Sequence, residues 1–187
     1  MRASPRPNRL PRLTAASKFF RDQRGIIAVE FAFIAPIALL LLYGEYTLSD
    51  AFSAKRKLTI TAHTVADLVA QKSSVSSAMV TTYLNASAQI MAPYSATPLS
   101  IVVSELTTDA SGNTTVTWSA ALNATALTTG AKVTLPTGLA QNSTSLIWST
   151  ASYTYTPLLG QTVFGAMNFN SQFYTNPRVA GTVSYTN

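Results

Sequence analysis

The sequence has 187 residues, no cysteine and a formal net charge of +6. The absence of cysteine excludes disulfides, thiol catalysis and the commonest zinc sites, and the length suits one domain with one additional element. Charged residues make up 11% of the composition, well below the roughly 25% of soluble domains, so we expect a polar but largely uncharged surface.

The net positive charge is confined to residues 1–25. This segment has seven Lys and Arg residues and one Asp, whereas the six cations and six anions after it cancel. A basic segment beside an apolar run is typical of a membrane topology signal, and no basic face with interleaved aromatic residues follows it. We therefore predict a basic cytoplasmic leader over 1–25 and no nucleic-acid partner.

Residues 26–44 are nineteen residues with one charge. A helix of that length would span about 28 Å, close to the roughly 30 Å of a bilayer's hydrocarbon core, and Pro36 predicts a kink rather than a break. The positive-inside rule then places the N-terminus in the cytoplasm and the residues beyond about 50 on the far side. The alternative is a long secretory signal peptide cut after a small residue such as Ala51, although the apolar run exceeds the usual length.

Glu30 is the one charge within this run. A carboxylate near the cytoplasmic end can reach the headgroups and lies at a helix N-terminus, which permits Glu30 without requiring it. Its neighbours indicate more, because Gly25 is followed by four apolar residues, then by Glu30 and Phe31. This order is the prepilin cleavage pattern.

The segment RGIIAVEFAFIAP resembles the N-terminus of TadE-like pilus assembly proteins, the minor pseudopilins of tight-adherence (Flp-type) pilus systems. The likeness covers most of residues 22–180, with supporting matches in TAHTVADLVAQ, SIVVSEL, DASGNTTVTWSAALN, ASYTYTPLLG and TNPR. It implies that Gly25 precedes the scissile bond, that Ile26 becomes the new N-terminus and that Phe31 is the sixth mature residue. It also implies that Glu30 pairs with the N-terminal amine of a neighbouring subunit, an attraction that a low dielectric strengthens.

The same resemblance implies the partners. They are a membrane-embedded prepilin peptidase, other pseudopilins and pilins, and the inner-membrane pilus assembly platform. Flp pilins are very short, whereas this chain has more than a hundred residues after its membrane segment, so we do not expect it to be the major fibre subunit.

Residues 45–91 are predicted to form an extracytoplasmic helical stalk. Apolar residues recur at helical spacing up to Val69 without proline or glycine. Either one helix runs over about 26–72, or a membrane helix is followed by a separate amphipathic one. The serines of KSSVSS indicate a break and then a cap for a second helix from about Ser76 to Met91.

Residues 92–187 are predicted to be rich in β-structure. LSIVVSEL and TTVTWSAAL flank a turn around Asp109, TSLIWSTASYTYTPL predicts a third long strand, and residues 130–143 predict a loop. The expected fold class is α+β: a long N-terminal transmembrane helix continuing into an extracytoplasmic helix, followed by a small, mostly antiparallel β-sheet domain.

No pattern of catalytic residues is found, so we predict neither an enzyme nor a cofactor. His63, the single histidine, is interpreted as a helix-surface residue rather than a metal ligand, since a usual site needs three or four ligands. Glu105 and Asp109 are interpreted as a strand and a turn residue. Four aromatic residues of the strands are interpreted as core or cross-strand partners rather than as the lining of a groove: Trp118, Trp148, Tyr153 and Tyr155.

Together with the resemblance to TadE-like proteins, these observations lead us to expect a membrane-anchored minor pseudopilin with a structural role in assembling a tight-adherence pilus. We expect a single-pass protein of the bacterial inner membrane with a periplasmic C-terminal domain, its entry into the surface pilus being left open. One alternative is an uncleaved bitopic envelope protein whose outer domain binds a ligand or another protein. Another is a secreted domain, such as a hydrolase, released by signal peptidase.

Overall fold

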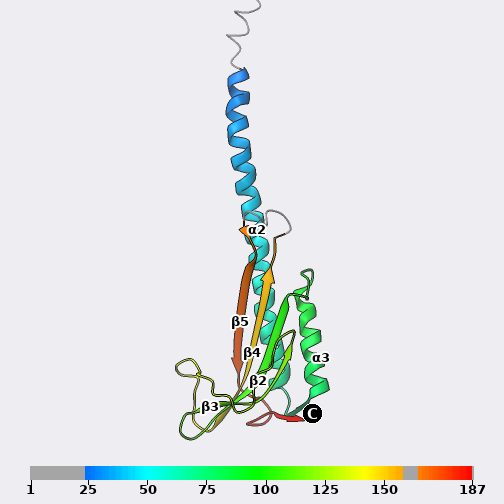
Figure 1. The fold of residues 1–187 in the computed structure, drawn as a ribbon, viewed down its shortest axis with the longest axis vertical. Coiled ribbons are helices and arrows are strands. Elements are labelled where there is room, and N and C mark those ends of the chain that lie inside the picture. Colours follow the sequence, from blue (N-terminus) through cyan, green and yellow to red (C-terminus); the bar gives the residue numbers. More distant parts are fainter. Residues whose placement is uncertain (1–23, 158–163, 187) are drawn as a thin grey trace, which may run out of the picture. The chain divides into compact units, whose positions relative to one another are not determined.

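The computed structural model describes residues 24–157 and 164–186 (Figure 1). The chain divides into two units, Met1–Tyr46 and Thr47–Asn187, which are described separately below as the first and the second unit. The predicted leader lies outside the described residues except for its last two, Arg24 and Gly25.

The longest element is helix α2 (Arg24–Ala70). It continues through Pro36 without a break, and it confirms the continuous alternative over about 26–72. Every described residue of the first unit belongs to this helix. A long N-terminal apolar helix followed by a small antiparallel sheet is thus the architecture, as the α+β prediction expected.

In the second unit, α2 buries one stripe of its surface. The buried positions recur every three or four residues, which keeps them on one helix face, and several are alanines that let a sheet approach closely. They are Ala51, Ala54, Leu58, Ala62, Val65 and Val69.

A short second helix follows a break, as the serine pattern predicted. Helix α3 (Ser77–Ala88) begins after Ser76, whose hydroxyl accepts a hydrogen bond from Met79 N at 3.2 Å. The one-turn 3-10 helix η1 (Gln89–Met91) ends the helical region. The side chains of Val80, Leu84 and Met91 enter the same core as the buried stripe of α2.

Four strands form an antiparallel sheet in the order β3-β2-β4-β5. The strands are β2 (Leu99–Thr108), β3 (Thr114–Leu122), β4 (Thr144–Tyr155) and β5 (Met167–Thr175). The predicted turn between the first two is present: Asp109 Oδ1 accepts from Ser111 N and Asn113 N at 2.8 and 2.9 Å. Gly112 supplies the positive φ of +82° that this turn needs.

Strand β5 and a small parallel pair were not predicted. The pair joins β1 (Ser74–Ser76) to β6 (Ser184–Thr186), two three-residue strands too short to leave a periodic pattern. Strand β5 does alternate, since Phe169, Ser171 and Phe173 face α2 between exposed amides. Its apolar content is too low for the sequence pattern to stand out.

One face of the sheet covers the helices and makes the core. Ile101, Val103 and Ile147 are fully buried on that face, together with Tyr153 and Tyr155. The opposite face carries hydroxyls and amides. The second unit therefore has a single core between its helices and one sheet face, and an open sheet face on the other side.

Candidate functional site

The four residues of the predicted processing and assembly site lie in the first turns of α2. Gly25 is the second residue of the helix, and a Cβ added to it would meet no atom within 4 Å. The side chains of Ile26 and Phe31 are 62% and 70% exposed, and Glu30 is exposed as well. The structure brings them together as sequence neighbours on one helix, not through a tertiary contact.

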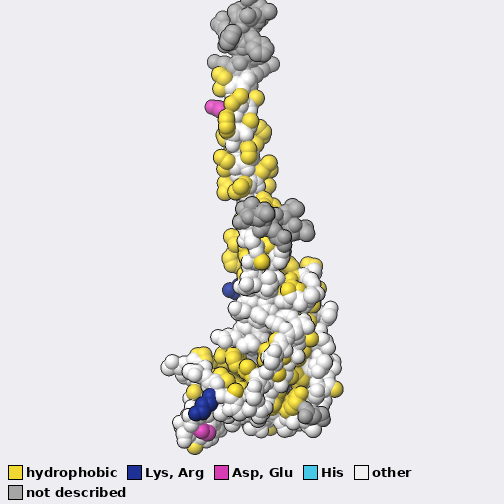
Figure 2. All heavy atoms as spheres, in the orientation of Figure 1, with side chains coloured by type: hydrophobic (Ala, Val, Ile, Leu, Met, Phe, Trp, Pro, Cys, Tyr) yellow, Lys and Arg dark blue, Asp and Glu magenta, His cyan; other side chains and the backbone are white. Residues whose placement is uncertain are grey.

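The helix around these residues has an apolar surface on all sides. Its most apolar 18-residue window has a mean hydropathy of 2.5 and none of it is buried. Figure 2 shows hydrophobic side chains along this part of the chain. Among the described residues one helix, α2, is long and apolar enough to cross a membrane. This criterion of length and composition is compatible with a single-pass anchor. The exposed apolar side chains here include Ile27, Val29, Phe33, Ile34, Ile37, Leu39, Leu40, Leu41 and Leu42.

Glu30 is the chemical exception on this surface. No described residue forms a hydrogen bond or an ion pair with its carboxylate. Glu30 follows Ile26 by four residues, so the two lie one turn apart on the same face of the helix. In an apolar medium an ionised carboxylate needs a counter-charge or hydrogen-bond donors.

No protein-family model, curated protein or solved structure matches this chain. The resemblance over residues 22–180 therefore rests on sequence motifs and their order.

A buried carboxylate in the second unit was missed as a special position. Glu105 is 1% exposed, and its Oε2 accepts from the indole Nε1–H of Trp118 at 2.9 Å. Its Oε1 accepts from the hydroxyl of Ser145 and the backbone N–H of Val183, both at 2.8 Å. The period of two in the strand would have found it, because Glu105 follows Ile101 and Val103 on the core face.

The buried Glu105 holds the C-terminal segment onto the sheet. The same indole N–H also donates to the carbonyl of Val183 at 2.8 Å, and the ring of Tyr185 stacks on Trp118 with centroids 5.0 Å apart. The next residues pair as β6 with β1. This cluster satisfies its own polar atoms, so we interpret it as structural.

The remaining candidates have packing roles. Trp118, Tyr153 and Tyr155 are buried in the core. Trp148 lies on the open face, where it is the cross-strand partner of Tyr174. Both positions agree with the prediction of core or cross-strand partners. His63 stacks on Phe173 of β5 with ring centroids 3.6 Å apart, so it contacts the sheet. Among the described residues no group of three His, Asp or Glu side chains could hold a metal ion.

Proposed function

We propose that this protein is a TadE-like minor pseudopilin, anchored in a bacterial inner membrane, with a structural role in assembling a tight-adherence pilus. Residues 26–44 would cross the membrane, with the basic leader in the cytoplasm and the second unit in the periplasm. One observation carries the proposal: the exposed apolar run of α2 contains one charged residue, Glu30, which follows Gly25 by five residues and has no partner among the described residues.

The chemistry of Glu30 supports this function. A charged side chain at the centre of a membrane helix costs roughly 2.5–3.5 kcal/mol on insertion scales, and less towards the interface. Cleavage after Gly25 would create an ammonium group at Ile26 in the same layer. A neighbouring subunit that presents its ammonium to Glu30 would neutralise both charges where the dielectric is low. Cleavage after Gly25 would thus supply the counter-charge that Glu30 needs.

The proposed partners follow from this role. The prepilin peptidase would recognise the leader and Gly25. Other pseudopilins and pilins would contact the apolar helix of this chain, including its Glu30 and Phe31. The inner-membrane platform would receive the processed subunit. Nothing in this role requires catalysis by the chain itself.

A second candidate is an uncleaved bitopic envelope protein with a periplasmic binding domain. It is favoured by a hollow on the open face of the sheet, which is lined by neutral polar side chains such as Asn170 and Gln172. It shares the membrane anchor and differs in keeping its leader. Sequencing the mature N-terminus from the native host separates the candidates: Ile26 supports the pseudopilin and Met1 supports the bitopic protein. A start near Phe52 would contradict both.

Three variants test the roles of Gly25 and Glu30. Gly25→Ala should retain the leader, and because the added Cβ meets no atom, lost cleavage would report recognition by the peptidase rather than misfolding. Glu30→Gln should be cleaved yet fail to support pilus assembly. Glu45→Gln is the matched control, since Glu45 is an exposed glutamate on the same helix beyond the apolar run; it should behave as wild type. Normal pili with both Gly25→Ala and Glu30→Gln would refute the proposal.

A further inference from the structure

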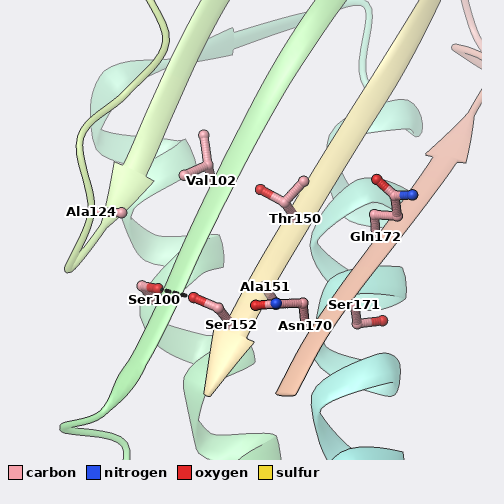
Figure 3. Close-up of a pocket in the computed structure, with 9 residues that line it drawn as sticks. All are labelled: Ser100, Val102, Ala124, Thr150, Ala151, Ser152, Asn170, Ser171 and Gln172. Atoms are coloured by element: carbon pink, nitrogen blue, oxygen red, sulfur yellow. Dashed lines mark hydrogen bonds between the residues drawn. The ribbon is translucent and has the colours of Figure 1, made fainter. Parts of the chain in front are cut away.

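A hollow lies on the open face of the sheet in the second unit, opposite the helices (Figure 3). Its volume is about 530 Å³, within the roughly 300–1,000 Å³ of small-molecule sites. Strand register places its side chains in rungs, because directly opposed residues of antiparallel strands share a face. One rung is Ser100–Ser152–Asn170 and the next is Val102–Thr150–Gln172.

The hollow contains no charged group among its described residues. They are Ser100, Val102, Ala124, Thr150, Ala151, Ser152, Asn170, Ser171 and Gln172. Ala151 and Ser171 border the hollow between the two rungs, although their side chains are directed towards the helices. Between residues 99 and 175 the sequence has only Glu105, Asp109 and Lys132 as charged residues. Of these, Glu105 is buried on the other face and Asp109 is bound within its own turn. A charged ligand would lose hydration here without gaining a counter-charge, which is unfavourable.

Several polar groups of the hollow are available to a ligand. The side chains of Asn170 and Thr150 have no hydrogen-bond partner among the described residues, and Asn170 and Gln172 are exposed. The hydroxyls of Ser100 and Ser152 bond to each other at 2.6 Å and retain further accepting capacity. A side-chain amide both donates and accepts hydrogen bonds. Two neighbouring amides and a row of hydroxyls therefore suit a ligand whose own groups both donate and accept.

An aromatic rung borders these polar rungs. Trp148 and Tyr174 are the next opposed pair on the same face, and their rings stack at 5.8 Å with an interplanar angle of 1°. Two residues along a strand correspond to about 7 Å, so these rings lie one step from Thr150 and Gln172. The open face thus combines neutral hydrogen-bonding groups with two half-buried aromatic rings beside them.

We propose that this hollow binds a neutral saccharide of one or two sugar units. A sugar carries hydroxyls that donate and accept around its rim and C–H faces that pack on aromatic rings, which matches both parts of the surface. A purely apolar ligand would leave the amides and hydroxyls unpaired, a loss of about 1–3 kcal/mol for each group that becomes buried. The proposal stands on the second unit alone and does not depend on pilus assembly.

The test is a titration of the full-length chain with neutral sugars. The protein is held in a zwitterionic detergent, because detergents with sugar headgroups would compete for the site. The probes are glucose, galactose, N-acetylglucosamine and maltose, followed by tryptophan fluorescence and by ligand-detected NMR. We expect at least one to bind saturably, with a dissociation constant in the range of about 0.1–10 mM for so small a ligand.

Two matched variants locate the binding. Asn170→Ala with Gln172→Ala should weaken it about tenfold or more, since each amide loses a hydrogen bond. Asn168→Ala is the control: Asn168 has the same side chain on the same strand and face, but it bonds Thr154 at 2.8 Å and lies outside the hollow. Its affinity should match wild type, and circular dichroism should show that all variants are folded.

Three outcomes would overturn the proposal. The first is that no sugar binds saturably below about 10 mM. The second is that the double variant and Asn168→Ala bind equally well. The third is that a charged probe, glucose 6-phosphate, or an extended Ser/Thr-rich peptide binds more tightly than every neutral sugar.

Discussion

The carboxylate of Asp50 accepts a hydrogen bond of 2.6 Å from the hydroxyl of Tyr155, a residue 105 positions further along the chain. Its other oxygen accepts from the hydroxyl of Tyr94, also at 2.6 Å. Short O–H···O⁻ bonds are among the stronger ones in proteins. Asp50 therefore ties α2 to the end of β4 and to the segment after η1.

Removing this carboxylate should destabilise the second unit. For Asp50→Ala we expect a loss of about 2 kcal/mol in the free energy of unfolding, because hydrogen bonds to charged groups contribute about 1.5–3 kcal/mol and this site is only partly buried. The matched control is Asp67→Ala, which breaks an exposed salt bridge to Arg178 of 2.7 Å with side chains 38% and 55% exposed. Such pairs contribute about 0–1 kcal/mol.

The measurement for Asp50 is urea unfolding of the full chain in detergent, followed by near-UV circular dichroism. An Asp67→Ala loss as large as that of Asp50→Ala would contradict the assignment.

Tyr94 should make stability fall at alkaline pH. Burial, together with the hydrogen bond to Asp50 and its negative charge, raises the pKa of Tyr94 to about 12, from about 10 in an unfolded chain. Because the folded pKa is the higher, the stabilisation is complete below about pH 10 and is lost as pH rises through about 12. The advantage of wild type over Tyr94→Phe should thus shrink across this interval.

Thermal unfolding of both proteins between pH 8 and the alkaline range checks the role of Tyr94. The raised pKa values of Tyr153 and Tyr174, both due mainly to burial, affect the two proteins alike. A constant difference at all pH values would show that Tyr94 is not the titrating group.

The buried Glu105 should be sensitive even to a nearly isosteric change. Glu105→Gln replaces one accepting oxygen by an NH₂ group, so a buried donor loses its acceptor at a cost of about 1–3 kcal/mol. Glu105→Ala removes the carboxylate that accepts hydrogen bonds from Trp118, Ser145 and Val183. The free energy of unfolding should fall by about 3 kcal/mol or more. Ser145→Ala, which removes one hydroxyl donor, is the control at about 1 kcal/mol.

Hydrogen exchange provides a second measurement at Glu105. The amide of Val183 donates to Glu105 at 2.8 Å, so its exchange should accelerate in both Glu105 variants and change little in Ser145→Ala. Unchanged protection at Val183 in Glu105→Ala would mean that the carboxylate does not hold the C-terminal segment.

The turn at Asp109 should weaken under acid conditions. Hydrogen bonds from the Asn113 side chain and from the backbone N–H groups of the turn lower the pKa of Asp109. Because the folded pKa is depressed, its stabilisation is present above about pH 4 and lost as pH falls through the folded value. The difference between wild type and Asp109→Ala should therefore decrease below about pH 4.

Gly112→Ala is the control for this turn. It strains a residue at φ +82° and should cost about 1 kcal/mol at every pH. Thermal unfolding from neutral to acidic pH distinguishes the two variants, and parallel curves would contradict the role of the Asp109 charge.

Local features were predictable because their causes are local. Ser76 and the helical spacing set the start of α3, and Asp109 with Gly112 set the first hairpin turn. The apolar run of α2 and the position of Glu30 after Gly25 are likewise visible in the sequence. The two alternatives for the helix over about 26–72 were not distinguishable by periodicity, and the structure has the continuous one.

Helix α3, three of the long strands, the apolar segment and the candidate processing site could be predicted from residue patterns alone, because neighbours within a few residues set helix caps, turns and periodicity. The partners of residues far apart became known from the folded chain: β5 at the sheet edge, β6 beside β1, Glu105 bonded to Val183, and the rungs of amides and hydroxyls on the open face. These choices depend on cross-strand register and burial. Register and burial depend on contacts between residues that are distant along the chain, and the local pattern around each residue does not show which distant residue it will contact.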